Sequence, residues 1–164
     1  MNKQFYEGVW NVKHIRDNKI IHESNNYNAL LNDGEEMLLK TFFQGNTEIT
    51  TFYMRLATDK LTEGDGLVEA ANLEPSSNGY AAYNITKDTA GFPTVGYDAS
   101  QDWYIQSVTA TFTASGGTIG PVVGAFLASG SSNSGKLISY VPFSSARSIL
   151  DGDVLELTMK VTLR

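Results

Sequence analysis

The sequence predicts an all-β protein, an antiparallel β-sandwich of about eight strands with one short helix inserted near the N-terminus. Three observations lead to this prediction. Apolar and polar residues alternate with a period of two in several segments, most regularly in residues 154–163. Clusters of Gly, Ser, Asn and Asp separate these segments, as turns between strands do. A helix with recognisable start and stop signals is expected only before residue 45.

The first elements are a hairpin and then a helix. Apolar residues on both sides of the polar turn 16–19 predict a β-hairpin over residues 8–23, because Asp and Asn tolerate left-handed backbone. The helix is expected within residues 29–43. Asp33 is its expected N-cap, and Glu36 completes a pair that resembles a capping box. Gly45 is expected to end the helix.

The remaining chain is expected to be β-structure joined by loops. Loops are predicted at 59–78, 87–100 and 129–135, and a turn is predicted at 151–153. Pro142 is expected to limit the strand before it. The strands are predicted at 49–57, 80–86, 103–113, 118–128 (a bulged or central strand), 137–141 and 154–163.

Composition fits one domain, residues 1–164, with residues 1–8 as a candidate extended N-terminal arm. Hydrophobic residues make up 41% and charged residues 18%, which argues against a disordered chain. The net charge of −6 disfavours a nucleic-acid partner, because phosphate contacts need a basic surface. Without cysteine, disulfides and thiolate chemistry are excluded. No apolar run predicts a membrane span or a signal peptide, so we expect a soluble protein made in the cytoplasm and no membrane partner.

No catalytic motif is recognisable, so we expect no enzyme activity, no cofactor and no metal. His14 and His22 lie on opposite arms of the predicted hairpin and are candidate metal ligands, but no third ligand has a matching spacing. Packing histidines are therefore the simpler expectation. Carboxylates are candidates for calcium or for glycoside hydrolysis, although Asp-Gly pairs mark turns first. These carboxylates are Glu63, Asp65, Glu69, Glu74, Asp98 and Asp102.

Several short motifs follow one another in an order that resembles a known family. They are Asn28–Leu31, Leu38–Phe43, Phe52–Leu56, Asn78–Ala81, Gly124–Leu127 and Gly152–Leu155. Their succession is similar to that in small tailed-bacteriophage virion proteins, in particular capsid decoration (cement) proteins with a jelly-roll-like body. Periodicity alone leaves the jelly roll and the immunoglobulin-like sandwich open.

The resemblance implies a virion structural protein that is made in the host cytoplasm and binds the outer capsid surface. Its partners would be the major capsid protein and two further copies of itself in a homotrimer. The expected contact regions are residues 1–10, 59–78 and 87–102. Exposed aromatic rings anchor interfaces well. The candidate interaction residues are Phe5, Tyr6, Trp10, Tyr80, Tyr97 and Trp103.

Two alternatives remain open. A phage tail, fibre or baseplate component belongs to the same setting and also uses β-sandwich domains. A carbohydrate-binding β-sandwich module belongs to a different class and would stack sugars on exposed Tyr or Trp rings. Filling of the core is the simpler role for several of these aromatic residues.

Overall fold

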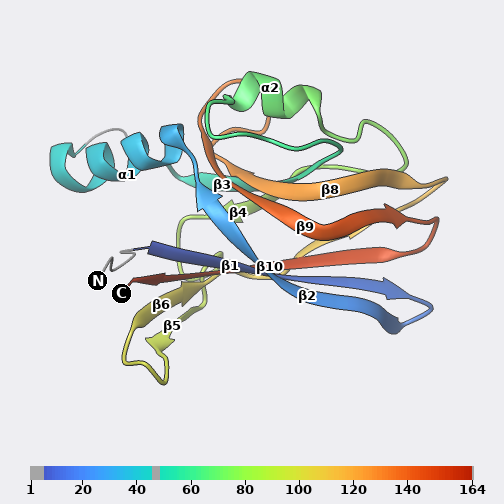
Figure 1. Ribbon diagram of the computed structural model, residues 1–164, viewed down its shortest axis with the longest axis horizontal. Coiled ribbons are helices and arrows are strands. Elements are labelled where there is room, and N and C mark those ends of the chain that lie inside the picture. Colours follow the sequence, from blue (N-terminus) through green and yellow to red (C-terminus); the bar gives the residue numbers. More distant parts are fainter. Residues whose placement is uncertain (1–5, 46–48, 164) are drawn as a thin grey trace.

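The main feature of the computed structural model, which describes residues 6–45 and 49–163, is a curled antiparallel β-sheet (Figure 1). This confirms the prediction of a mostly antiparallel β protein. The helices are α1 (Asn32–Gln44) and α2 (Leu67–Asn72). The strands are β1 (Tyr6–Arg16), β2 (Lys19–Leu30), β3 (Thr51–Ala57), β4 (Tyr83–Thr86), β5 (Thr94–Tyr97), β6 (Trp103–Gln106), β7 (Ala110–Thr113), β8 (Ile119–Ala128), β9 (Leu137–Ile149) and β10 (Val154–Leu163).

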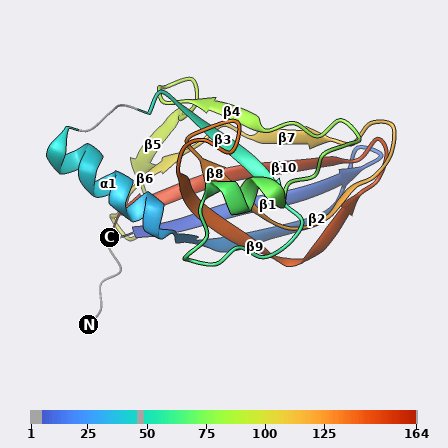
Figure 2. The same ribbon diagram turned by 90° about the horizontal axis from the view of Figure 1, so that it is seen from above.

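Nine of these strands follow one path in the order β4-β3-β8-β9-β2-β1-β10-β6-β5, and β7 pairs with β10 beside that path. Strand β2 joins the two halves of the sheet. Most of β2 pairs with β1, whereas its last residues, Ala29 and Leu30, pair with β9. The sheet curls at this point, so that β3, β8 and β9 lie over β1, β2 and β10 (Figures 1 and 2).

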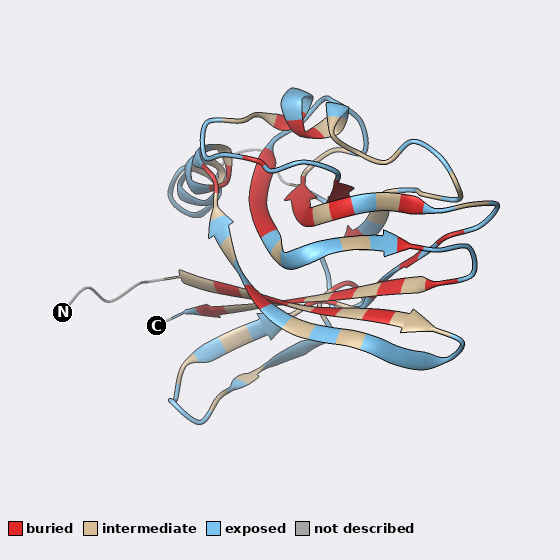
Figure 3. Ribbon diagram, turned by 45° about the vertical axis from the view of Figure 1, so that its right-hand side comes forward, coloured by how far each residue is buried: buried red, intermediate tan, exposed pale blue. Residues whose placement is uncertain are grey.

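The core lies between the two halves because each strand turns one row of side chains inward. Trp10 and Val12 contribute from β1, and Met54 and Leu56 contribute from β3. Along β1, buried and less buried positions alternate, as Figure 3 shows. In the last strand, β10, the regular alternation of residues 154–163 implies an inward row of Leu155, Leu157, Met159, Val161 and Leu163. The first three are buried, but Val161 is only half-buried and Leu163 is 60% exposed at the end of the sheet.

The predicted turns are present at the predicted residues. Asp17 and Asn18 both have positive φ (49° and 59°) and join β1 to β2 in a two-residue turn. Gly45 ends α1 in the left-handed conformation, and its N–H donates to the carbonyl of Lys40. Gly152, with φ of 83°, forms the turn before β10. These positions were predictable because a turn depends on its own few residues.

The N-terminus of α1 differs from the prediction. Leu31, not Asp33, is the N-cap, and no side chain caps the helix. Asp33 and Glu36 instead accept hydrogen bonds from Lys136 Nζ, at 2.9 and 3.3 Å. The capping-box prediction was wrong because Lys136, about 100 residues away in the sequence, provides these carboxylates with a cationic partner.

The expected count of about eight strands is too low. The stretch predicted as one strand, 103–113, is divided into β6 and β7 at Ser107, whose hydroxyl accepts the N–H of Met159 and interrupts the regular pairing with β10. The predicted loop 87–100 contains β5, and the predicted loop 59–78 contains the helix α2. Elements of four to six residues are too short to give a clear periodic signal.

Pro142 does not end its strand, because β9 continues to Ile149. The ladder between β8 and β9 is irregular here: Gly124 pairs with Pro142, and the next pair is Val122 with Arg147. A proline lacks the N–H that a regular ladder needs, and an irregularity removes that requirement. The predicted bulge of β8 lies between Ile119 and Val122, where three steps along β8 oppose two along β9, and the pairing of β8 with both β3 and β9 confirms that it is central.

Neither α1 nor α2 is long and apolar enough to cross a membrane, and the described residues contain no further helix.

Candidate functional site

One end of the molecule exposes many large apolar side chains. Helix α1, the β5–β6 hairpin and the end of β10 lie together at this end in two perpendicular views (Figures 1 and 2). We call this surface the apolar end. Its exposed side chains, with 37–81% of their surface accessible, are Leu38, Leu39, Phe42, Phe43, Val95, Tyr97, Trp103, Ile105 and Leu163.

Helix α1 exposes most of its apolar residues because only its N-terminal half packs against the sheet, where Met37 contacts the core. The N–H of Leu31 donates to the carbonyl of Ile138, and Gly34 is the one buried residue of the helix. From there the helix projects beyond the sheet (Figure 1). The apolar residues of α1 form a stripe along the helix, and this stripe lies largely in contact with solvent: Phe42 is 81% and Phe43 is 76% exposed.

A pocket of about 290 Å³ connects α1 to the sheet at the apolar end. Met37 and Leu38 line it from the helix, while Ile105 and Val161 line it from β6 and β10. Tyr6 lies at the start of β1 and also contributes to the lining. The interior of the curled sheet thus opens to solvent between α1 and the β5–β6 hairpin.

Two of the predicted interaction residues form part of this surface. Tyr97 and Trp103 face each other across β5 and β6, with ring centroids 4.1 Å apart, and each is more than half exposed. Tyr6 is half-buried and its hydroxyl accepts a hydrogen bond from Asn28 Nδ2 at 3.2 Å. Phe5 lies outside the described residues.

The other two predicted residues serve the interior. Trp10 is completely buried in the core, so its prediction as an interaction anchor was wrong. Alternation places it on the inward face of β1, together with Val12. Tyr80 stacks on Phe112, and its hydroxyl donates to Glu74 at 2.6 Å and accepts the N–H of Leu56 at 3.0 Å. Burial and the neighbouring Glu74 carboxylate raise the pKa of Tyr80.

Three residues of the candidate N-terminal arm, 6–8, belong to a strand of the sheet. Tyr6 pairs with Leu163, and Gly8 pairs with both Val161 and Asn28, so residues 6–8 form part of β1. Residues 1–5 lie outside the described residues.

The two histidines face each other but have different partners. His14 is directly opposite His22 in the hairpin register, as their places on opposite arms implied. His14 Nε2 lies 2.9 Å from Asp153 Oδ2, whereas His22 Nε2 lies 3.1 Å from Ser24 Oγ. Burial, followed by the cation of Arg147 and then His14, lowers the pKa of His22. The described residues hold no group of three or more His, Asp or Glu side chains arranged for a metal ion.

The carboxylates of the predicted loops bind within the fold. Glu74 pairs with Arg55, whose side chain is 3% exposed and also donates to the carbonyls of Gly130 and Ser132. Glu69 Oε2 accepts the N–H of Gly66 at the start of α2. Two further acidic residues support turns in a similar way: Asp65 accepts from Thr62, and Asp98 accepts from the N–H groups of Ser100 and Asp102.

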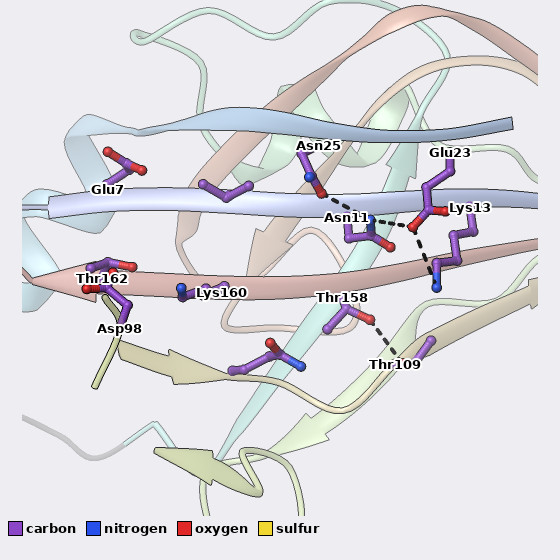
Figure 4. A pocket seen from close by; sticks show the side chains of 12 residues that line it. Glu7, Asn11, Lys13, Glu23, Asn25, Asp98, Thr109, Thr158, Lys160 and Thr162 are labelled. Carbon is purple, nitrogen blue, oxygen red and sulfur yellow. Dashed lines mark hydrogen bonds and ion pairs between the residues drawn. The ribbon is translucent and has the colours of Figure 1, made fainter. Parts of the chain in front are cut away.

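A second surface feature is a polar groove on the outer face of β2, β1 and β10 (Figure 4). It has a volume of about 560 Å³ and is lined by twelve residues, most of them polar or charged. Asn11 Nδ2 lies between Asn25 Oδ1 and Glu23 Oε1, at 3.0 and 3.1 Å. None of the candidate interaction residues that the structure describes lies in this groove, although the alternation of polar residues along the hairpin indicates a polar outer face.

Comparison with known proteins gives no match: no family model and no curated protein sequence matches the chain. The resemblance to decoration proteins therefore rests on the short motifs described above.

Proposed function

We propose that this chain is a virion structural protein, a decoration (cement) protein that binds the outer capsid surface and stabilises contacts between major capsid proteins. The observation that carries the proposal is the apolar end, which gives a β-domain a large surface for contact with other proteins. The capsid setting comes from the succession of sequence motifs. Localisation to the virion surface, after synthesis in the host cytoplasm, belongs to the same proposal.

The size of the apolar end supports a role in assembly. Large exposed apolar patches mark interaction sites, because monomeric soluble proteins rarely expose more than about 300–600 Å² in one patch. A whole large apolar side chain presents an area of ~150–250 Å². With the exposed fractions of the nine side chains, the apolar end exposes on the order of 1,000 Å² in total. A stable interface of standard size buries about 800 Å² on each partner.

Self-association into a homotrimer is the arrangement we propose. Neighbouring copies would cover the apolar end of each subunit, and the assembled trimer would bridge several capsid proteins. A ring of three copies has closed symmetry, so contacts between different patches do not continue into a fibre. A jelly-roll-like body is the architecture we propose for this role, and the pairing of strands distant in sequence, β1 with β10 and β3 with β8, supports it.

Light scattering coupled to size-exclusion chromatography tests the self-association. We expect a trimer mass for the unaltered chain and a monomer mass for the double variant F42S/F43S. The matched control is I20S/I21S, which removes two exposed apolar side chains from the hairpin tip at the opposite end (54% and 49% exposed) and should stay trimeric. A monomer at every concentration would contradict the proposed trimer.

Co-sedimentation with emptied capsids of the parent phage tests the partner. We expect the unaltered chain and I20S/I21S to pellet with capsids and to saturate at a fixed ratio to the major capsid protein. Absence from the pellet would contradict the capsid role. A trimer that instead pellets only with isolated tails would support the alternative of a tail, fibre or baseplate component.

A further inference from the structure

The polar groove on the outer face of β2, β1 and β10 presents a dense array of hydrogen-bonding groups. Besides the contacts of Asn11, the hydroxyl groups of Thr109 and Thr158 lie 2.9 Å apart across the groove. Amide and hydroxyl side chains both donate and accept, and the bonds within the groove use only part of that capacity. Asn25, for example, accepts from Asn11 through its oxygen, while its amide nitrogen carries two further donor positions.

The charges of the groove are mixed and nearly balanced. Three carboxylates (Glu7, Glu23 and Asp98) and two ammonium groups (Lys13 and Lys160) line it, which gives a net charge of −1. A nucleic acid or another polyanion requires a clear excess of positive charge. The groove is therefore better suited to a neutral ligand with many hydroxyl groups.

Several contacts hold the groove in a defined shape before any ligand binds. Lys13 Nζ lies 3.6 Å from Glu23, and Lys160 Nζ lies 4.2 Å from the centre of the Tyr104 ring. The lining side chains stand on neighbouring strands of a hydrogen-bonded sheet. A preformed site spends less free energy on ordering its side chains when a ligand binds.

An exposed aromatic ring lies beside the groove. Tyr27 is 68% exposed and pairs directly with Val9, which is part of the groove lining. Directly paired residues of antiparallel strands have their side chains on the same face of the sheet. Tyr27 thus provides an apolar ring face on which a sugar ring can stack. The polar groups beside it can bind the hydroxyl groups of that sugar.

The length of the groove suits an extended ligand. Its lining on β1 runs from Glu7 to Lys13. Six residue steps along a strand cover about 20 Å, which is enough for a short oligosaccharide and more than a single sugar needs.

We propose that the polar groove binds a neutral oligosaccharide, with Asn11, Asn25, Thr109 and Thr158 contacting its hydroxyl groups and Tyr27 stacking on one sugar ring. This inference does not depend on the proposed capsid role, because the groove and the apolar end are different surfaces. A decoration protein with such a groove would bind glycans of a cell surface from the outside of the virion.

Gel electrophoresis in the presence of soluble polysaccharides provides the first test. The probes are the neutral polymers dextran, laminarin, xylan and galactomannan, together with the polyanion heparin. We expect at least one neutral polymer to retard the full chain and heparin to have no effect. Retardation by heparin alone would overturn the proposal in favour of a polyanion site, and migration unaffected by all five polymers would also overturn it.

An NMR titration then locates the site, with the pentasaccharide of the polymer that retards the chain. We expect shifts of the backbone amides of β1, β2 and β10, and a dissociation constant about tenfold higher or more for the double variant N25A/Y27A. Both substituted side chains are exposed, and unchanged amide dispersion checks that the variant is folded. The control F42S/F43S should bind normally. Binding that is lost in F42S/F43S and kept in N25A/Y27A would overturn the assignment to the groove.

Discussion

Asp153 connects the turn before β10 to the end of β1 through one buried carboxylate. Its Oδ atoms accept hydrogen bonds from Arg16 at 2.7–3.1 Å, and Oδ2 also accepts the N–H of Leu150 at 3.1 Å. The ring of His14 lies 2.9 Å away, and the Asp153 side chain is 3% exposed. The hydrogen bonds from Arg16 lower the pKa of Asp153 most. Burial opposes this effect and the contact with His14 adds to it, so the pKa lies well below its usual range. The ionised carboxylate therefore stabilises the fold.

This pKa shift predicts how stability depends on pH. Because the pKa is lower in the folded than in the unfolded chain, the contribution is complete above the unfolded value of about 4 and is lost as the pH falls below it. Urea unfolding of the unaltered chain should show this loss. In the variant D153N the free energy of unfolding should be about 1–3 kcal/mol lower at pH 7, the usual cost of losing hydrogen bonds to a charged group, and should decline less steeply below about pH 4. D17N, in the exposed turn nearby, is the control and should retain the decline; an equally steep decline in D153N would contradict the role of Asp153.

At the scale of elements, the attachment of α1 depends on the close approach of its first turn to β9. A Cβ atom at Gly34 would lie 2.1 Å from the carbonyl oxygen of Ile138, which is far too close for two atoms that are not bonded. Lys136, just before β9, binds Asp33 and Glu36 on the same helix. The helix is thus held at one end only, and this arrangement leaves its apolar residues exposed.

Replacement of Gly34 by Ala tests this close approach. Alanine favours a helix over glycine by about 1 kcal/mol, so helix propensity alone predicts stabilisation. The clash with the backbone of β9 opposes it, and overpacking of this kind costs about 1–3 kcal/mol. We expect G34A to lower the free energy of unfolding in urea. The control is G64A, where an added Cβ has nothing within 4 Å and which should be neutral or slightly stabilising. Equal stability of G34A and G64A would show that α1 is not held against β9 in this way.

At the scale of the whole molecule, the two ends of the sheet have different characters. The end with the β1–β2 turn is closed by polar contacts such as those of Asp153, whereas the other end opens into the apolar pocket beside α1. A second copy that covers the apolar end would remove these side chains from water. Folding and association would then be linked, because the partner binds only the folded chain.

This linkage predicts a melting temperature that depends on protein concentration. For a trimer of this chain length we expect the midpoint to rise by about 2–3 °C for each tenfold increase in concentration. Scanning calorimetry over a hundredfold range measures it. The midpoint of F42S/F43S should stay constant, and that of I20S/I21S should rise like that of the unaltered chain. A constant midpoint for the unaltered chain would argue against association through the apolar end.

The fold class and several turns followed from the sequence because their causes are local. A period of two determines which face of a strand is apolar, and the Asp-Asn and Asp-Gly pairs form turns through their own backbone preferences. Tyr97 and Trp103 were also candidate exposed rings in the sequence, and both are more than half exposed. Their predicted role in an interaction stays a prediction.

Other features required contacts between distant segments. Trp10 and Tyr97 are both aromatic residues in strands. Alternation puts Trp10 on one face of β1, but only the curl of the sheet makes that face part of the core and leaves Tyr97 at the surface. The stripe on α1 has the period of a helix that packs against a core, yet only Gly34 is buried. The polar groove combines residues from β2, β1, β10 and β6 with Asp98 and Thr109, so its composition depends on the pairing of β1 with β2 and of β10 with β1 and β6.

The sequence by itself determined an antiparallel β protein with an early helix, turns at 16–19 and 151–153, and no recognisable catalytic motif. The tertiary structure alone decided that α1 stands away from the sheet, that the core opens at one end and that a polar groove crosses four neighbouring strands. The physical reason is the distance along the sequence over which each cause acts. Backbone preferences and periodicity act within a few residues, whereas the exposure of a side chain depends on strands and loops that are far away in sequence.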